Sequence, residues 1–169
     1  MRRRVSIFDT SLYCCWLGVP GRETAGSPPN FWDGPRVDHL IAETAKSGST
    51  IILPLATVIE AGNHIAQSQH ERFKHASKLC GHLKEALQGE TPWVTFTDQS
   101  SFWTEEHLLK IVEEWPVLAE ARMSFGDATI KRVADYYASA GFDVTILTAD
   151  EQLRAYEPAK PSAFPRRSR

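Results

Sequence analysis

The stretch that decides the fold is residues 125–151, FGDATIKRVADYYASAGFDVTILTADE. Its first half repeats apolar residues at helical spacing, which predicts a helix over residues 127–139. The apolar face of this helix is formed by Ile130, Val133, Ala134 and Tyr137. Gly141 ends the helix, and the apolar run at 143–147 predicts a buried strand. A helix followed at once by a buried strand is typical of an α/β fold.

The lengths of these two segments bring two carboxylates to the same edge of the sheet. Thirteen helical residues descend roughly 19 Å at about 1.5 Å per residue. The chain from Asp143 to Ala149 climbs back roughly 23 Å at about 3.3 Å per residue. We therefore expect Asp127 and Asp150 to lie at a similar level.

The rest of the chain continues the alternation of strands and helices. Short apolar runs predict strands at residues 4–8, 50–55 and 93–96. Helical patterns are found in four further segments: residues 36–46, 57–67, about 70–89, and a helix from Thr104 that Pro116 should break or kink.

Two segments are expected to be irregular. The tripeptide Asp9-Thr10-Ser11 predicts a polar turn at the end of the first strand. Residues 18–35 carry four glycines and four prolines, which predicts a long loop anchored by Phe31 and Trp32.

Length and composition are those of one domain. With 169 residues and 42% hydrophobic content, the chain can bury one sizeable core, so we expect a single domain over residues 1–169. The formal charge is −2, but arginines cluster at both ends and predict flexible basic tails at residues 1–3 and about 159–169. Three cysteines give no disulfide or metal-ligand spacing, and no apolar stretch is long enough to span a bilayer. These features predict a soluble, cytoplasmic protein.

Four acidic residues fall where a predicted strand ends or a helix begins: Asp9, Glu60, Asp127 and Asp150. In a parallel α/β sheet, strand ends and helix starts share the edge where ligands bind. Carboxylates gathered at one edge repel each other unless a cation lies among them. Because all the donors are oxygens, the pattern favours Mg²⁺ or Mn²⁺ over zinc.

Each acid also has a structural interpretation. Ser124 to Asp127 and Thr148 to Glu151 both match the capping box, so Asp127 and Asp150 could serve as helix caps. Asp9 could cap its turn. Glu60 lies in a nearly apolar stretch, where a lone buried carboxylate is costly without a partner.

Short strings around the four acids, in their order along the chain, resemble the PIN domain, the nuclease fold of VapC-like toxins in toxin–antitoxin pairs. The strings are IFDTS at residues 7–11, VIEAGN at 58–63, FGDA at 125–128 and LTAD at 147–150. The resemblance runs nearly end to end. It implies a three-layer α/β/α sandwich with a central, mainly parallel sheet. It also implies magnesium or manganese, hydrolysis of RNA phosphodiester bonds, a homodimer and an antitoxin partner.

The four acids are assigned separate roles in this interpretation. Asp9 and Asp127 are expected to bind the metal directly, Asp150 directly or through water, and Glu60 as a ligand or by orienting the attacking water. The hydroxyls and amide expected to hold the carboxylates in register belong to Thr10, Ser11, Asn63 and Thr148. Lys131 and Arg132 could contact phosphate, while Trp32 and Trp103 could stack on bases.

Three other functions compete with this one. Four histidines lie between residues 64 and 82, but their spacings of six, five and seven residues do not suit chelation on one helix, so solvated surface positions are expected. A haloacid-dehalogenase-like phosphoryl transfer requires a second Asp two residues after Asp9, where this chain has Ser11. A PIN-like module that binds RNA or a protein partner without catalysis stays open as the main alternative.

Overall fold

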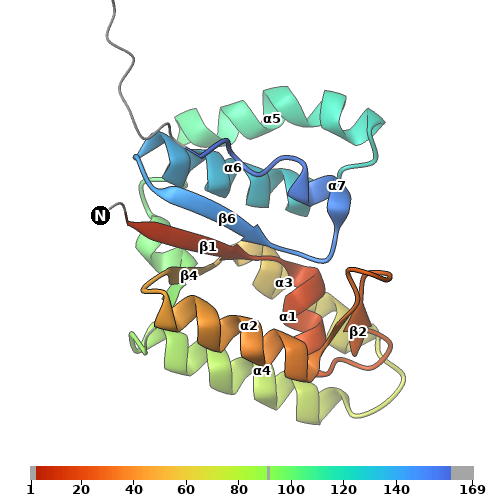
Figure 1. The fold of residues 1–169 in the computed structure, drawn as a ribbon. Coiled ribbons are helices and arrows are strands. Elements are labelled where there is room, and N and C mark those ends of the chain that lie inside the picture. The colour runs from red at the N-terminus through yellow and green to blue at the C-terminus, as the bar shows by residue number, and fades with distance from the viewer. Residues whose placement is uncertain (1–2, 91, 161–169) are drawn as a thin grey trace, which may run out of the picture.

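A four-stranded parallel sheet forms the centre of the molecule (Figure 1). The computed structural model describes residues 3–90 and 92–160. The strand order is β5-β4-β1-β6, and every neighbouring pair is parallel. The strands are β1 (Arg4–Phe8), β4 (Thr50–Leu53), β5 (Trp93–Thr95) and β6 (Asp143–Leu147). The predicted α/β fold class is confirmed.

Helices cover both faces of this sheet, which gives the three-layer α/β/α sandwich. On one face lie α1 (Thr10–Leu17), α2 (Gly34–Lys46), α3 (Leu55–Gln67) and α4 (Arg72–Leu87). On the other face lie α5 (Glu105–Glu120), α6 (Phe125–Ser139) and α7 (Glu151–Arg154). A short 3-10 helix, η1 (Phe96–Gln99), follows β5.

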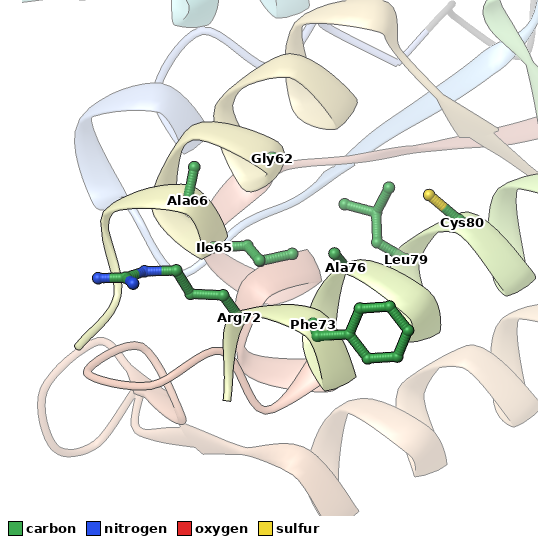
Figure 2. A pocket seen from close by; sticks show the side chains of 8 residues that line it. All are labelled: Gly62, Ile65, Ala66, Arg72, Phe73, Ala76, Leu79 and Cys80. Carbon is green, nitrogen blue, oxygen red and sulfur yellow. The ribbon is translucent and has the colours of Figure 1, made fainter. Parts of the chain in front are cut away.

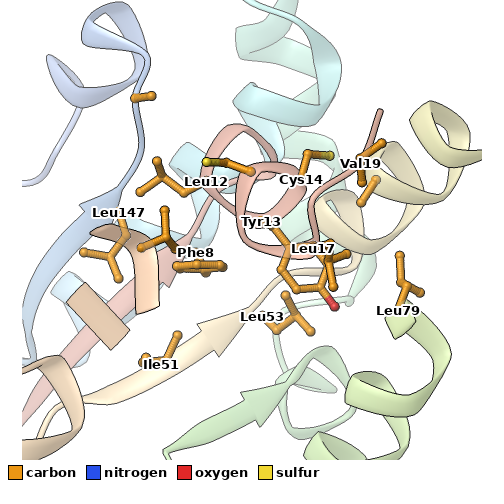
Figure 3. Close-up of a cluster of buried hydrophobic side chains, with 14 of the residues drawn as sticks. Phe8, Leu12, Tyr13, Cys14, Leu17, Val19, Ile51, Leu53, Leu79 and Leu147 are labelled. Atoms are coloured by element: carbon orange, nitrogen blue, oxygen red, sulfur yellow. The ribbon is translucent and has the colours of Figure 1, made fainter. Parts of the chain in front are cut away.

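Alternation along the strands divides the core into two clusters. Ile7 is the register partner of both Ile52 and Ile146, and all three belong to the cluster under α5, α6 and α7. Phe8 and Leu147, the next pair along, belong to the cluster under α1 to α4 (Figure 3). Successive side chains of a strand point to opposite faces, so a sheet covered on both sides must be apolar at nearly every position.

The predicted polar turn after β1 is wrong, because α1 begins there directly. Asp9 is the N-cap of α1, and its side chain accepts a hydrogen bond from the Ser11 backbone N–H. Most residues of α1 are buried, from Thr10 to Leu17. A helix that is apolar nearly all round has no amphipathic pattern, so periodicity did not reveal it.

Three helices begin two residues before their predicted starts. The N-caps are Asp33 for α2, Pro54 for α3 and Ser124 for α6. The N–H groups of the first turn have no intrahelical partners and bind caps or water instead. The apolar period marks only the residues that face the core, so it does not show where the helix starts.

The predicted loop at residues 18–35 contains a small hairpin. Its strands, β2 (Thr24–Ala25) and β3 (Trp32–Asp33), pair antiparallel. Trp32 packs against the core cluster under α1 to α4 as expected, but Phe31 is 41% exposed and does not anchor the loop.

Helix α4 buries two of its histidines. Phe73 is 86% exposed, whereas His75 and His82 are buried, so the predicted solvated histidines are wrong at these two positions. His82 packs among aromatic rings and its Nδ1 lies 2.9 Å from the Tyr13 hydroxyl. Burial lowers the pKa of His82 to about 4, so the ring is neutral near pH 7.

Helix α5 continues through Pro116 to Glu120, so the break expected at that proline is absent. The helix buries Ile111 and leaves Leu108, Leu109, Val112 and Val117 exposed. An apolar side of α5 thus faces away from the core.

The predicted basic tails fall mainly outside the described residues, since Arg2, Arg166, Arg167 and Arg169 lie there; Arg3 and Arg4 are exposed where β1 begins. Among the helices of the described ranges, none combines the length and the apolar character that crossing a bilayer requires.

Candidate active site

The four predicted acids come from four separate elements. Asp9 joins β1 to α1, and Glu60 lies in the second turn of α3. Asp127 is the third residue of α6, and Asp150 is the N-cap of α7, just after β6. Each position follows a strand end or lies near a helix start, which places these acids toward the edge formed by the strand ends.

Asp9 is held by three hydrogen bonds to a single carboxylate oxygen. Its Oδ2 accepts from the Ser11 hydroxyl at 2.6 Å, the Thr148 hydroxyl at 2.7 Å and the Ser11 backbone N–H at 3.2 Å. The Asp9 backbone N–H donates to the Leu147 carbonyl at 3.0 Å, which continues the pairing of β1 with β6. The side chain is only 3% exposed. Its position is therefore fixed by both neighbouring segments.

Glu60 packs directly against the first turn of α6. The Thr10 hydroxyl donates to Glu60 Oε2 at 2.8 Å. The other oxygen, Oε1, lies 1.9 Å from the point where a Cβ on Gly126 would be. A larger residue at position 126 would push this carboxylate out of its present place. The sequence contained Gly126 in the FGDA string, but nothing in the string showed that the glycine makes space for Glu60.

Asp127 forms a local capping arrangement with Ser124. The Asp127 backbone N–H donates to the Ser124 hydroxyl at 2.9 Å, and that hydroxyl donates to Asp127 Oδ2 at 2.8 Å. Ser124 is therefore the N-cap of α6, as the capping box predicts. Asp127 nevertheless keeps its second oxygen, Oδ1, without a donor from the part of the chain that is described.

Electrostatics show that three of the acids form one group. Burial is the main cause that raises the pKa of both Asp9 and Glu60 above the ordinary values. Hydroxyl donors oppose the rise, from Ser11 and Thr148 to Asp9 and from Thr10 to Glu60. The charge of Asp127 raises both pKa values further, and Asp9 also raises that of Glu60. The site thus disfavours negative charge on these carboxylates.

Asp150 lies at the border of this group. Its Oδ1 accepts from the backbone N–H groups of Gln152 at 2.7 Å and Leu153 at 3.3 Å, so it caps α7 as the structural interpretation proposed. It is exposed and contributes to neither the Asp9 nor the Glu60 pKa. Its link to the group is indirect, because its backbone N–H donates to the same Thr148 hydroxyl that holds Asp9.

The predicted supporting residues divide in two. Thr10, Ser11 and Thr148 donate hydrogen bonds to the carboxylates. Asn63 is exposed on α3 and lines a pocket with Glu60.

The two basic residues expected at phosphate already have acidic neighbours. Lys131 lies 2.8 Å from Asp135 and 3.4 Å from Glu114. Arg132 approaches the same two acids at 3.7 Å. Phosphate contact by either residue stays a prediction, and it would compete with these ion pairs.

Sequence reasoning missed Arg22, a cation near the acidic group. A pocket of about 360 Å³ is lined by Ser11, Arg22, Gly26, Ala149 and Asp150, among others. The charge of Arg22 also acts on Cys14, as do those of Asp9 and Glu60. Arg22 lies in the irregular segment before β2, far along the chain from three of the acids, so no local pattern linked it to them.

Cysteine chemistry at this edge is disfavoured. Burial raises the pKa of Cys14 to about 12, and Arg22 offsets only part of that rise. The thiol is therefore protonated near pH 7 and is a poor nucleophile.

Two further pockets lie along α3. One of about 400 Å³ is lined by Glu60 together with residues of α6 and the segment before α5. The other, of about 360 Å³, is an apolar groove between α3 and α4 that includes Ile65, Phe73 and Leu79 (Figure 2). The groove contains none of the four acids, so we do not assign it to the site.

The acids are not assembled as a ready-made metal site. Within residues 3–90 and 92–160, no three Asp, Glu, His or Cys side chains are placed so that they could hold one ion. The hydrogen bonds described above nevertheless leave Asp9 Oδ1, Glu60 Oε1 and Asp127 Oδ1 without a protein donor in those ranges. These hard oxygen donors have the chemistry that Mg²⁺ and Mn²⁺ prefer.

Compared with known proteins, the chain matches no family model, no curated protein and no solved structure.

The raised pKa of Glu60 gives a prediction for the free energy of unfolding. A carboxyl whose pKa is raised in the folded protein contributes stability that is complete below its ordinary value of 4.5 and is lost as pH rises through the folded value. Glu60→Gln keeps an acceptor for Thr10 but carries no charge. In chelator, we expect this variant to be more stable than wild type, with a difference that grows from about pH 5 to about pH 8.

Urea unfolding at both pH values measures this difference. Glu113→Gln is the matched control, because Glu113 is exposed on α5 and should show no such trend. A Glu60→Gln protein with no pH-dependent advantage would contradict the electrostatic description of the site.

Proposed function

We propose that the protein is a divalent-metal-dependent ribonuclease of the PIN type, an endonuclease that hydrolyses RNA phosphodiester bonds. The observation that carries the proposal is the group of Asp9, Glu60 and Asp127. They come from three separate elements, and the charge of Asp127 raises the pKa of both Asp9 and Glu60. Each keeps one oxygen without a donor among the described residues. Carboxylates placed in this way lower the stability of the folded protein when no cation is bound. A metal-dependent function would explain why the protein has them.

Mg²⁺ or Mn²⁺ fits the donor chemistry of these three residues, with Asp150 as an outer ligand. A divalent ion supplies charge to neutralise the scissile phosphate and lowers the pKa of the attacking water. The three side chains would have to shift toward one another to bind an ion, and relief of their mutual repulsion favours that shift.

The residues of the chain have distinct roles in the proposed reaction. Asp9 is the ligand held most firmly in place, since the Ser11 and Thr148 hydroxyls donate to Oδ2 and leave Oδ1 available for the ion. Glu60 is suited to orient the attacking water and accept its proton, because burial raises its pKa toward the working pH. Arg22, beside Ser11 and Asp150 in the adjoining pocket, is a candidate contact for a phosphate of the RNA strand.

The nuclease proposal is tested with purified protein and labelled single-stranded and structured RNA, in manganese and in excess chelator. Cleavage should require the ion. Asp9→Asn and Asp127→Asn should each lower cleavage by about 100-fold or more, since loss of residues that merely support metal ligands already costs about 10- to 100-fold. Asp150→Asn should cost less than about tenfold, because Asn caps a helix nearly as well as Asp.

A matched glycine pair separates the site from general stability. Gly126→Ala should displace Glu60 and reduce cleavage, whereas Gly81→Ala, a helix position with open space around it, should leave cleavage unchanged. Thermal melts confirm that each variant folds. Cleavage that persists in chelator or in Asp127→Asn would refute the proposal, and RNA binding without cleavage would favour the non-catalytic alternative.

As a toxin of a toxin–antitoxin pair, the protein would form a homodimer and bind an antitoxin that covers the acidic group. The exposed apolar side of α5, with Leu108, Leu109 and Val112, supports a self-association surface in the region from Trp103 to Trp115. Trp103 and Trp115, which bound that region, are only partly exposed.

Light scattering at tens of micromolar protein tests the dimer. We expect a dimer for wild type and a monomer for the double variant Leu109→Glu, Val112→Glu, because two buried carboxylates in an interface lack partners. Phe73→Glu, an exposed apolar residue on α4, is the control and should remain dimeric. A monomeric wild type would contradict the surface assigned here.

A further inference from the structure

A polar pocket lies at the edge of the sheet where β1 and β6 begin, opposite to the edge that carries the acidic group (Figure 1). Its volume is about 310 Å³, which is within the range of small-molecule sites. The first residues of β1 and β6 contribute part of the lining, and the C-terminal half of α2 contributes another part. None of the four acids is among the lining residues. A ligand in this pocket would therefore not contact the acidic group.

Four of the strand residues that line the pocket are polar, although a covered sheet is normally apolar. Side chains alternate along a strand, so Arg4 and Ser6 point to the same side of the sheet as Phe8, toward α1 to α4. The register partners of Arg4 and Ser6 on β6 are Asp143 and Thr145. Ser6 is only 6% exposed. Two neighbouring pairs of the sheet thus present polar side chains next to α2, which suits a polar ligand.

Several lining groups are available to accept hydrogen bonds. Asp143 Oδ1 is buried and has no partner in the part of the chain that the structure describes. The Thr44 hydroxyl donates to the Leu40 carbonyl and the Ser47 hydroxyl to the Thr44 carbonyl, both at 2.7 Å. A hydroxyl whose proton is used in this way can only accept a hydrogen bond from a ligand. The pocket therefore suits a ligand with several hydrogen-bond donors.

The lining also carries a positive charge. Arg4 and Lys160 are exposed, and Asp143 is the one carboxylate among the described lining residues. Two cations and one anion give a net charge of +1, so the pocket attracts a negative group. That group is expected near Arg4 and Lys160, and hydrogen-bond donors are expected near Asp143.

Three simpler occupants each fail one of these requirements. An apolar molecule would leave Asp143 Oδ1 unsatisfied. A divalent cation would meet a single carboxylate and two positive charges. Inorganic phosphate has too few donors for Asp143, Thr44 and Ser47 together. A molecule with several hydroxyls and one phosphate meets all the requirements.

We propose that this pocket binds a small sugar phosphate, with hydroxyls on Asp143, Thr44 and Ser47 and with the phosphate at Arg4 and Lys160. The site is separate from the acidic group, so this inference does not depend on the nuclease proposal.

Isothermal titration calorimetry on the full chain, in chelator, tests the inference with ribose 5-phosphate as the probe. We expect binding in the micromolar to millimolar range. Ribose and inorganic phosphate should each bind at least about tenfold more weakly, because each lacks the partners of one set of charged groups.

Two variants probe the two halves of the ligand. Asp143→Asn keeps the shape of the side chain but removes its charge, and it should raise the Kd for ribose 5-phosphate by about tenfold. Lys160→Gln removes an exposed cation, and it should raise this Kd by about two- to fivefold while leaving the Kd for ribose unchanged. Asp98→Asn, at an exposed position on η1, is the matched control and should have no effect. Thermal melts confirm that each variant folds.

Four results would overturn the inference. The first is the absence of ribose 5-phosphate binding at millimolar concentration. The second is inorganic phosphate that binds as tightly as ribose 5-phosphate, which would make the pocket a simple anion site. The third is displacement of ribose 5-phosphate by a short single-stranded RNA, which would make the pocket part of an RNA-binding surface. The fourth is an unchanged affinity in Asp143→Asn, which would place the ligand elsewhere.

Discussion

The hydrogen bonding of Asp9 is the constraint on which this end of the structure depends. One carboxylate oxygen caps α1 through the Ser11 N–H and joins the end of β1 to the end of β6 through Thr148. Burial of the group raises its pKa, so the three donors offset only part of the cost of removing the charge from water. A protein that needed only a helix cap could place it at the surface, as Asp150 is placed. The buried position of Asp9 therefore indicates a role beyond capping.

The acidic group also depends on close packing between layers. Helix α3 covers one face of the sheet and α6 the other, yet Glu60 of α3 reaches Gly126 in the first turn of α6. A side chain at position 126 would displace the Glu60 carboxylate, so the observed arrangement of the acidic group depends on glycine there. The pocket of about 400 Å³ beside Glu60 adjoins this contact, and Phe125 and Ile59 are among the residues that line it.

Sequence alone predicted the strand-helix alternation, because apolar runs and helical periodicity directly reflect burial. The α6–β6 unit was correct within two residues, and the four acids lie where strands end and helices begin. Helix α1 was missed because a helix apolar on all sides has no period. Two α4 histidines were misplaced because an imidazole can be buried where it finds partners, as His82 does among aromatic rings and His75 at the Leu17 carbonyl. Glu60 meets Gly126, and Arg22 lines a pocket together with Asp150, so both pairs join segments far apart in the chain. Such contacts leave no local pattern.

If Asp9, Glu60 and Asp127 gather to hold a divalent cation, as we propose, the melting temperature of the free protein should depend on that ion. Manganese at about 100 times its Kd should stabilise the folded state by about 2.7 kcal/mol, or roughly 5–10 °C for a domain of this size. The gain should be smaller in Asp127→Asn, which should itself melt no lower than wild type in chelator. A wild-type melting temperature that does not change between chelator and millimolar manganese would contradict the account.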